Sequence, residues 1–436
     1  MPTLLQIGAS LGMGSTGRIA EEIAALARTD GWKTYMAHGS RYVGKSQMNA
    51  IQIGSKLDEY IHFGQNLFFD NQGLASKKAT KNLLKQIDIV HPDVIHLHNI
   101  HGYYLNYPLL FDYIRKNRIP VVWTLHDCWS FTGHCAHFVT ADCNQWKDKG
   151  CHCCPLTNAY PKSFVDHSKR NFELKKKYFT SLRDVVVVSV SKWLKSQVDQ
   201  SFLALHSGIV IYNGVDTSIF KPTVNNIKSQ LGIENKKLLI GVATSWSKSK
   251  GLADYCQLAK ILSSDYQIVL IGLTTRQIKD LPENIIGIAR TNNVEELVQY
   301  YTAADIVLNL SYAETFGLTT VEGLACGTPS IVYKSTASPE LISEATGIVV
   351  DSGDISGVCD AISAIMKKGK EYYATSCRQQ AVEKFEKKTQ FMKYVELYNE
   401  IVSDRLTLFN GGGKTQIIVL YILYADFLLI ERRLSA

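Results

Sequence analysis

Two glutamates eight residues apart, Glu314 and Glu322, have the types and spacing that most clearly indicate chemistry in this chain. They lie in residues 313–329, which read Ala-Glu-Thr-Phe-Gly-Leu-Thr-Thr-Val-Glu-Gly-Leu-Ala-Cys-Gly-Thr-Pro. An apolar run at 305–310 predicts a buried strand, and the pattern from about residue 319 predicts a helix. A strand that feeds a helix through a tight turn presents free N–H groups and a positive helix end, which bind phosphate. We therefore expect both carboxylates beside a phosphate site.

Alternating strands and helices in each half of the chain should position these residues. The first half predicts strands at 3–8, 33–38, 93–98, 120–125 and 185–190, and the second at 237–243, 267–272, 285–289, 306–310 and 329–333. This alternation is typical of α/β proteins with parallel, doubly wound sheets. We expect two Rossmann-like domains that face each other across a cleft, with ligands at the carboxyl ends of the strands.

The predicted boundaries follow turn-rich and amphipathic segments. Residues 1–210 form the first domain and residues 211–385 the second. A one-faced helix at 386–403 follows, and residues 404–436 form an atypical apolar tail whose role the sequence does not indicate.

Bulk composition agrees with a two-domain enzyme. The chain has 436 residues, of which 46% are hydrophobic and 20% are charged, and its net charge of +7 mildly favours an anionic partner. The first residues lack the basic start of a secretory signal, and no apolar run approaches the length of a membrane span. We therefore expect a cytoplasmic protein.

The segment at 313–329 resembles the Glu-x7-Glu signature of retaining glycosyltransferases of family four, which have the two-domain GT-B fold. The resemblance extends from about residue 3 to about residue 403. It implies an enzyme that moves a hexose from a UDP- or GDP-linked sugar to a saccharide or lipid-linked glycan, with retention and without a catalytic metal, in surface polysaccharide biosynthesis. The alternative is a sugar-nucleotide epimerase or hydrolase on the same fold.

The resemblance implies roles in donor binding for residues of the second domain. Glu322 would accept hydrogen bonds from the ribose hydroxyls, and Glu314 would contact the donor sugar as a catalytic residue. Lys250 matches the family lysine at the phosphates. An arginine that the family often has five residues earlier is Ser245 here, so Lys248 is the nearest substitute. The backbone that would hold the diphosphate is that of Phe316, Gly317 and Leu318.

Two segments of the first domain would complete the site. The glycine-rich turn after the first strand would bring Gly14, Gly17 and Arg18 to the phosphate. His126 ends a strand and would touch the donor sugar, and Asp127 would act on the acceptor side. An exposed helix arginine and a structural histidine are the plain alternatives for Arg18 and His126.

A cysteine-rich loop at 128–154 is the second clear signal. Cys135, Cys143, Cys151 and Cys154 have spacings that suit a tetrahedral structural zinc site, with free thiols or disulfides as alternatives. Cys153, His134, His137 and His152 are nearby alternative ligands. The loop, which ends in Cys-x2-Cys-Pro, resembles that of colanic-acid and capsular polysaccharide transferases.

Basic clusters suggest a further partner. Lys77, Lys78, Lys81 and Lys85 share one helix face, and a second cluster comprises Lys169, Arg170 and residues 175–177. They are either solvated faces or a contact with the anionic inner face of a membrane, where a lipid-linked acceptor would lie. Nucleic acid is not expected, because no aromatic residues interleave with the basic ones.

Overall fold

The computed structural model describes residues 1–147 and 149–409. The N-terminal domain is built on a seven-stranded sheet in the order β3-β2-β1-β4-β5-β6-β7, in which every pairing is parallel. The strands are β1 (Thr3–Leu11), β2 (Lys33–Val43), β3 (Asn49–Gln52), β4 (Val94–Leu97), β5 (Val121–Leu125), β6 (Val185–Ser189) and β7 (Ser207–Val210). β4 and β5 are buried along their whole length, as expected of strands that helices cover on both faces.

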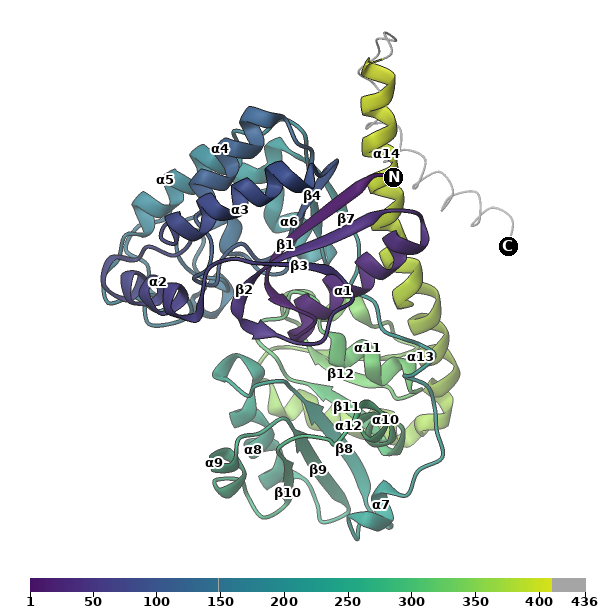
Figure 1. The fold of residues 1–436 in the computed structure, drawn as a ribbon. Helices are drawn as coiled ribbons and strands as arrows, with labels where there is room; N and C mark the ends of the chain where they lie inside the picture. The colour runs from purple at the N-terminus through teal and green to yellow at the C-terminus, as the bar shows by residue number, and fades with distance from the viewer. Residues whose placement is uncertain (148, 410–436) are drawn as a thin grey trace.

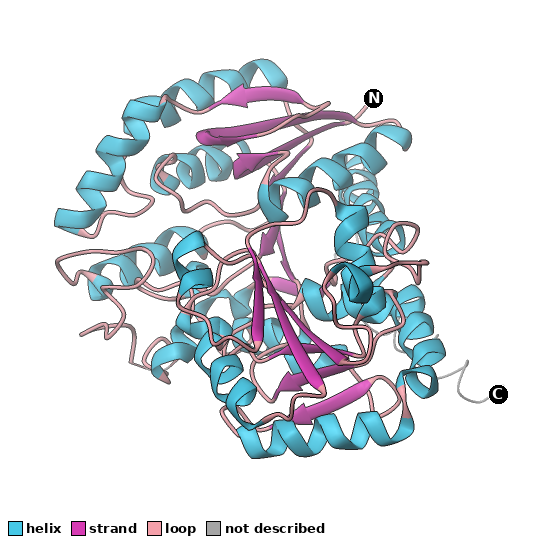
Figure 2. Ribbon diagram, turned by 90° about the horizontal axis from the view of Figure 1, so that it is seen from below, coloured by secondary structure: helices cyan, strands magenta, loops and turns pink. Residues whose placement is uncertain are grey.

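Helices connect these strands and flank the sheet (Figure 2). They are α1 (Gly14–Thr29), α2 (Lys56–Phe69), α3 (Lys77–Val90), α4 (Tyr107–Asn117), α5 (Ser168–Phe179) and α6 (Lys192–Val198). The cysteine-rich loop follows β5 and holds only short 3-10 turns at Trp129–Phe131 and Phe138–Ala141 among its described residues.

The C-terminal domain repeats this plan on a six-stranded parallel sheet in the order β10-β9-β8-β11-β12-β13. Its strands are β8 (Lys237–Val242), β9 (Tyr266–Ile271), β10 (Ile285–Ile288), β11 (Ile306–Asn309), β12 (Ser330–Tyr333) and β13 (Gly347–Val350). Its helices are α7 (Ile227–Gln230), α8 (Leu252–Ile261), α9 (Thr275–Lys279), α10 (Val294–Ala303), α11 (Leu318–Ala325), α12 (Ile355–Lys368) and α13 (Lys370–Phe385). The prediction of two doubly wound α/β domains is confirmed. The strands that the sequence pattern missed, β3, β7 and β13, all lie at sheet edges.

A long terminal helix, α14 (Lys387–Phe409), runs from the C-terminal domain along the N-terminal one (Figure 1). Its residues Phe391, Tyr394, Val395 and Tyr398 pack in one apolar cluster with residues of β1, β4, β5 and β6. The Tyr398 hydroxyl lies 2.6 Å from His96 Nδ1, which makes His96 a buried contact of α14 rather than part of a ligand-binding surface.

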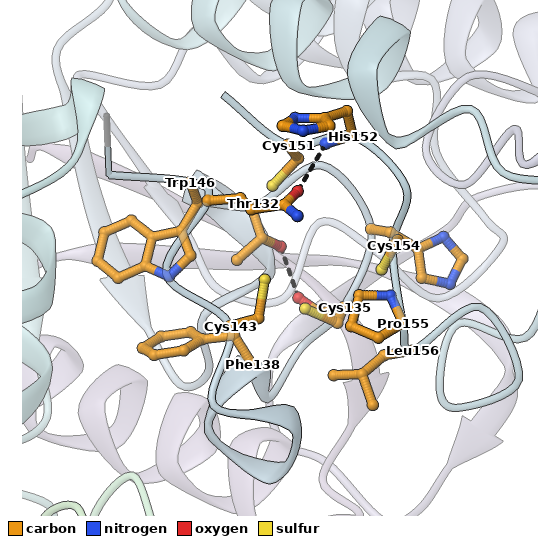
Figure 3. A pocket seen from close by; sticks show the side chains of 12 residues that line it. Thr132, Cys135, Phe138, Cys143, Trp146, Cys151, His152, Cys154, Pro155 and Leu156 are labelled. Atoms are coloured by element: carbon orange, nitrogen blue, oxygen red, sulfur yellow. Dashed lines mark hydrogen bonds between the residues drawn. The ribbon is translucent and has the colours of Figure 1, made fainter. Parts of the chain in front are cut away.

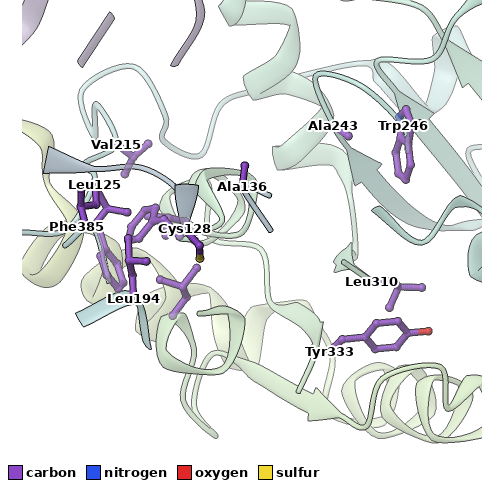
Figure 4. Packing of buried hydrophobic residues seen from close by; sticks show 14 of the residues in the cluster. Leu125, Cys128, Ala136, Leu194, Val215, Ala243, Trp246, Leu310, Tyr333 and Phe385 are labelled. Atoms are coloured by element: carbon purple, nitrogen blue, oxygen red, sulfur yellow. The ribbon is translucent and has the colours of Figure 1, made fainter. Parts of the chain in front are cut away.

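Apolar and polar contacts join the two domains. A single buried cluster includes residues of both, such as Leu125 and Leu194 on one side and Ala243 and Leu310 on the other (Figure 4). The Glu340 carboxylate accepts hydrogen bonds from the first two N–H groups of α6, at 2.9 and 3.0 Å.

Most of the predicted apolar tail, residues 410–436, lies outside the described residues. Within the part of the chain that the structure describes, no helix has the length and apolar character needed to cross a bilayer.

Candidate functional site

The turn between β11 and α11 carries the backbone part of the predicted donor site. α11 begins at Leu318, one residue after Gly317, whose φ of 104° lies in the left-handed region that favours glycine. A Cβ at Gly317 would also lie 3.0 Å from Leu341 Cδ1. No side chain of the described residues caps this helix. Its first N–H groups and positive dipole end are therefore available to an anionic ligand.

Lys250 and Glu314 form a close ion pair in front of this turn. Lys250 Nζ lies 2.6 Å from Glu314 Oε1, and the two side chains are 29% and 14% exposed. Gly251 sets the position of Lys250, because a Cβ at this left-handed residue would lie 2.1 Å from the Leu310 carbonyl oxygen. Lys248, in the same 3-10 turn, is exposed.

Glu322 lies in α11, and the structure shows its contact with a tyrosine of the same domain. Its Oε2 accepts a hydrogen bond of 2.8 Å from the Tyr301 hydroxyl. Burial raises the pKa of Glu322, whereas the Tyr301 hydroxyl and the charge of Arg18 act to lower it. Arg18 belongs to α1 of the N-terminal domain, so its charge acts on Glu322 across the junction of the domains.

The glycine-rich turn after β1 contains one closely packed glycine, Gly17, and one with open space around it, Gly14. Gly17 packs against β1, since a Cβ there would lie 2.8 Å from Ser10 Oγ. Gly14 begins α1 with a left-handed φ of 70°, and no atom lies within 4 Å of where its Cβ would be. Arg18 is exposed, and its Nε donates to the Gly14 carbonyl at 3.3 Å.

His126 follows β5 and belongs to a chain of hydrogen bonds that defines its tautomer. His98 Nε2 donates to the Gln6 side-chain oxygen at 2.8 Å, which leaves His98 Nδ1 as an acceptor. His126 Nε2 lies 3.2 Å from that nitrogen and therefore donates to it. Burial lowers the pKa of His126 to about 4. At neutral pH, His126 is thus uncharged and carries an accepting lone pair on Nδ1.

Both oxygens of Asp127 are already occupied by protein donors. Oδ1 accepts from the Trp129 N–H at 2.9 Å, and Oδ2 lies 2.8 Å from His101 Nε2. Burial alone would raise the pKa of Asp127, but His101 and the Trp129 N–H hold it well below its usual value. Asp127 is therefore a permanent carboxylate that fixes the start of the cysteine-rich loop.

A hydrogen bond and a histidine of the cysteine-rich loop connect the two domains at the candidate site. This histidine, His137, was predicted from the sequence only as an alternative metal ligand. Thr315 Oγ1 donates to the His126 carbonyl at 2.8 Å across the domain junction. His137 is exposed, and the protein atoms around it lower its pKa, on which the charges of Asp127, Lys250 and Glu314 also act. Its only signal in the sequence was its place among the cysteines. We call the group formed by Arg18, His126, His137, Lys250, Glu314 and Glu322 the interdomain site.

The four cysteines of the predicted zinc site line one small pocket in the N-terminal domain (Figure 3). All ten cysteines are described, and all are free thiols. Across residues 1–147 and 149–409, no group of three or more His, Cys, Asp or Glu side chains has an arrangement that could hold a metal ion. The zinc site thus stays a prediction. Lys175, which the sequence placed in a basic cluster, is buried rather than solvated.

Comparison with known proteins places the chain in a family. Residues 52–219 match the family model described as Glycosyltransferase Family 4, and residues 223–383 match the one described as Glycosyl transferases group 1. The two matches cover most of both domains. The chain therefore belongs to the family-four, group 1 glycosyltransferases, whose GT-B fold it shares.

Individual relatives are distant. The chain is 27% identical over 234 residues to an N-acetyl-alpha-D-glucosaminyl L-malate synthase of Bacillus anthracis. This match covers 50% of this chain and 60% of that protein. It is 25% identical over 275 residues to the putative colanic acid biosynthesis glycosyl transferase WcaC of Escherichia coli, covering 61% of this chain and 65% of that one. The matches thus span less than two thirds of these two relatives.

A solved structure extends the likeness over almost the whole fold. Anabaena HepE in complex with UDP-glucose superposes with a TM-score of 0.61 at 16% identity, covering 93% of this chain and all of that one. At this level of identity, the likeness concerns the fold alone.

Proposed function

We propose that this protein transfers a hexose from a nucleoside diphosphate sugar, UDP- or GDP-linked, to a saccharide or lipid-linked glycan, with retention at the anomeric carbon, in surface polysaccharide biosynthesis. The observation that carries the proposal is the Lys250–Glu314 ion pair of 2.6 Å directly before the uncapped N-terminus of α11. A cation and a helix end bind a diphosphate, and the adjacent carboxylate suits the sugar attached to it.

The donor's diphosphate would bind to the backbone N–H groups of Phe316, Gly317 and Leu318. Lys250 would turn from Glu314 to the phosphates, and Lys248 and Arg18 are exposed cations that would assist it. Lysine and helix dipole would then balance the charge of the departing nucleotide, so the proposal needs no catalytic metal. Glu322 would accept hydrogen bonds from the ribose hydroxyls.

Release of Glu314 from Lys250 would give the sugar a carboxylate partner. As the bond between C1 and the phosphate oxygen breaks, positive charge develops at C1, and Glu314 would stabilise it. His126 would accept a hydrogen bond from a sugar hydroxyl through Nδ1. The acceptor oxygen then bonds to C1, its proton passes to the departing phosphate oxygen, and the nucleoside diphosphate leaves. Asp127 would act by positioning, because both of its oxygens are already engaged.

We also propose that the protein acts in the cytoplasm, at the inner face of the membrane. Exposed apolar side chains of α2, including Leu57, Tyr60, Phe68 and Phe69, belong to the same domain as the exposed lysines of α3. Apolar insertion beside a basic helix suits an anionic bilayer. Vesicles that contain phosphatidylglycerol should bind the wild-type protein. They should not bind the variant in which Lys77, Lys78, Lys81 and Lys85 are changed to glutamate. Equal binding by both proteins would contradict the membrane contact.

The donor site can be tested before the acceptor is known. Titration calorimetry of the purified chain with UDP, GDP and their glucose conjugates should show binding of one nucleotide family, and Glu322→Ala should abolish it. No binding of any of these ligands would contradict the proposal. With a bound donor, nucleotide release that requires an added alkyl glycoside indicates transfer, and release without one indicates the hydrolase alternative.

A further inference from the structure

The pocket of the cysteine-rich loop contains a buried histidine nitrogen with no partner. His134 is 2% exposed, and its Nδ1 lies 2.8 Å from Asp70 Oδ1. Since a carboxylate only accepts, Nδ1 carries the proton and Nε2 carries a lone pair. Among the described residues, Nε2 is buried without any hydrogen-bond partner. A carboxylate on one imidazole nitrogen and an available lone pair on the other is the usual arrangement of a metal-bound histidine.

Four cysteines line the pocket together with His134, and Figure 3 labels all four. Three of their sulfurs, those of Cys135, Cys151 and Cys154, belong to the segment that carries this nitrogen or contact it through hydrogen bonds. The Cys135 thiol hydrogen-bonds to the sulfur of Cys154. Cys151 Sγ accepts a hydrogen bond of 3.1 Å from the Gly133 N–H. Because Gly133, His134 and Cys135 are consecutive, one short segment brings the nitrogen and these sulfurs into the same pocket.

A buried lysine lies beside the pocket. Lys175 is 1% exposed, and its Nζ donates to the carbonyls of Trp129 and Thr132 at 2.7 and 3.0 Å. No described carboxylate forms an ion pair with Lys175. Burial lowers the pKa of Lys175 to about 7, and Cys151, Asp70, Cys135 and Asp127 act to raise it. Lys175 therefore fixes the carbonyls of Trp129 and Thr132 beside the pocket without being a ligand.

We propose that His134 Nε2, Cys135, Cys151 and Cys154 bind one zinc ion in this pocket. Three sulfurs and one nitrogen form a common closed, tetrahedral structural site. The present side-chain positions do not yet form such a group, so binding includes rotation of the thiols toward His134. Cys143 also lines the pocket, but among the described residues its sulfur makes no hydrogen bond to the segment 133–135, unlike that of Cys151, so the proposed ligand set leaves it out.

The ion would order the loop that carries His137 to the interdomain site, and it would have no part in the chemistry. The site is thus independent of the proposed function: a protein that transfers sugar without zinc would overturn only this inference, and a zinc protein that binds no nucleotide would overturn only the function.

The experiment is elemental analysis and zinc-edge X-ray absorption of the full chain purified from zinc-supplemented cells. We expect one zinc per chain with three sulfur ligands and one nitrogen ligand. Zinc well below one per chain overturns the site, and a shell of four sulfurs overturns the role of His134. Both measurements use the unmodified protein, so neither depends on a variant that folds.

Substitutions then assign the ligands. His134→Gln and Cys154→Ser should each lower zinc content at least tenfold, whereas the matched control Cys143→Ser should keep one zinc per chain. Loss of zinc from Cys143→Ser, or retention by His134→Gln, would contradict the proposed ligand set.

Discussion

At the scale of residues, the surroundings have fixed the charge states of groups in the interdomain site and of Asp127, which follows His126 in the chain. Lys250 neutralises Glu314, burial keeps His126 uncharged, and Asp127 stays ionised. Glu322 differs from these groups, because burial raises its pKa above the ordinary carboxyl value. A ligand that supplies phosphate and hydroxyl groups would therefore change the partners of Lys250 and Glu322 most.

Replacement of Lys250 should separate its role from that of its neighbour Lys248. Lys250→Ala removes the cation beside the proposed phosphates, so we expect kcat/KM to fall by about 10²–10³. Stability should change by no more than about 1 kcal/mol, because the ion pair is partly exposed. Lys248→Ala, in the same turn, is the control and should lower kcat/KM less than tenfold. The reverse order of effects would assign the phosphate to Lys248.

The raised pKa of Glu322 predicts opposite pH dependences for folding and for nucleotide binding. A carboxyl group whose pKa is raised on folding binds more protons in the folded state, so its contribution to stability decreases as pH rises through that pKa. Binding of ribose hydroxyls requires the carboxylate, so affinity should decrease as pH falls. Calorimetry with the bound nucleotide from pH 8 to pH 5 should show this decrease in the wild type and a smaller one in Glu322→Gln. Phosphate protonation is common to both proteins, so equal pH profiles would contradict the assignment.

At the scale of elements, strand ends carry the site because parallel strands leave uncovered polar groups there. β11 ends before Glu314, β5 ends before His126, and the turn after β8 carries Lys250. The helix that follows β11 starts one or two residues earlier than the apolar pattern predicted. Gly317 explains the difference, because its left-handed backbone already closes the turn.

Gly317→Ala should weaken donor binding, whereas its loss of stability should be no larger than that of a control glycine substitution. The new Cβ would meet Leu341 and require a left-handed alanine, so the turn should move and affinity for the nucleotide should fall at least tenfold. Gly232→Ala is a matched control, since its φ is also left-handed at 65° but no atom lies within 4 Å of the new Cβ. Both variants should lose about 1–2 kcal/mol by chemical denaturation. Equal nucleotide affinity in both would show that the turn does not bind phosphate.

At the scale of the whole molecule, the two domains are held by contacts that lie outside the interdomain site. α14 packs on the N-terminal sheet, and Lys387 Nζ lies 3.0 Å from both Glu22 of α1 and Asp216. Glu340 holds the N-terminus of α6 from the opposite domain. The geometry of the site therefore depends on residues that contact no ligand.

Loss of the Glu340 contact should alter domain coupling. Glu340→Ala leaves two α6 N–H groups without their acceptor, so we expect a loss of about 0.5–2 kcal/mol in unfolding free energy. Small-angle scattering should show a larger radius of gyration without donor and a smaller difference with it. Glu344→Ala, an exposed neighbour, should match the wild type in both measurements. If Glu340→Ala also matches the wild type, the contact does not hold the domains together.

The sequence by itself determined the two doubly wound domains and the segment at 313–329, because apolar periodicity and turn residues are local and each domain repeats them. It did not indicate that the charge of Glu314 acts on His137, that Lys175 is buried or that Asp70 holds His134, since each of these depends on residues far apart in the chain. It also missed short edge strands such as β3, whose few residues carry too little pattern. Tertiary structure decided these points, because packing sets which loops meet and which polar groups lose water.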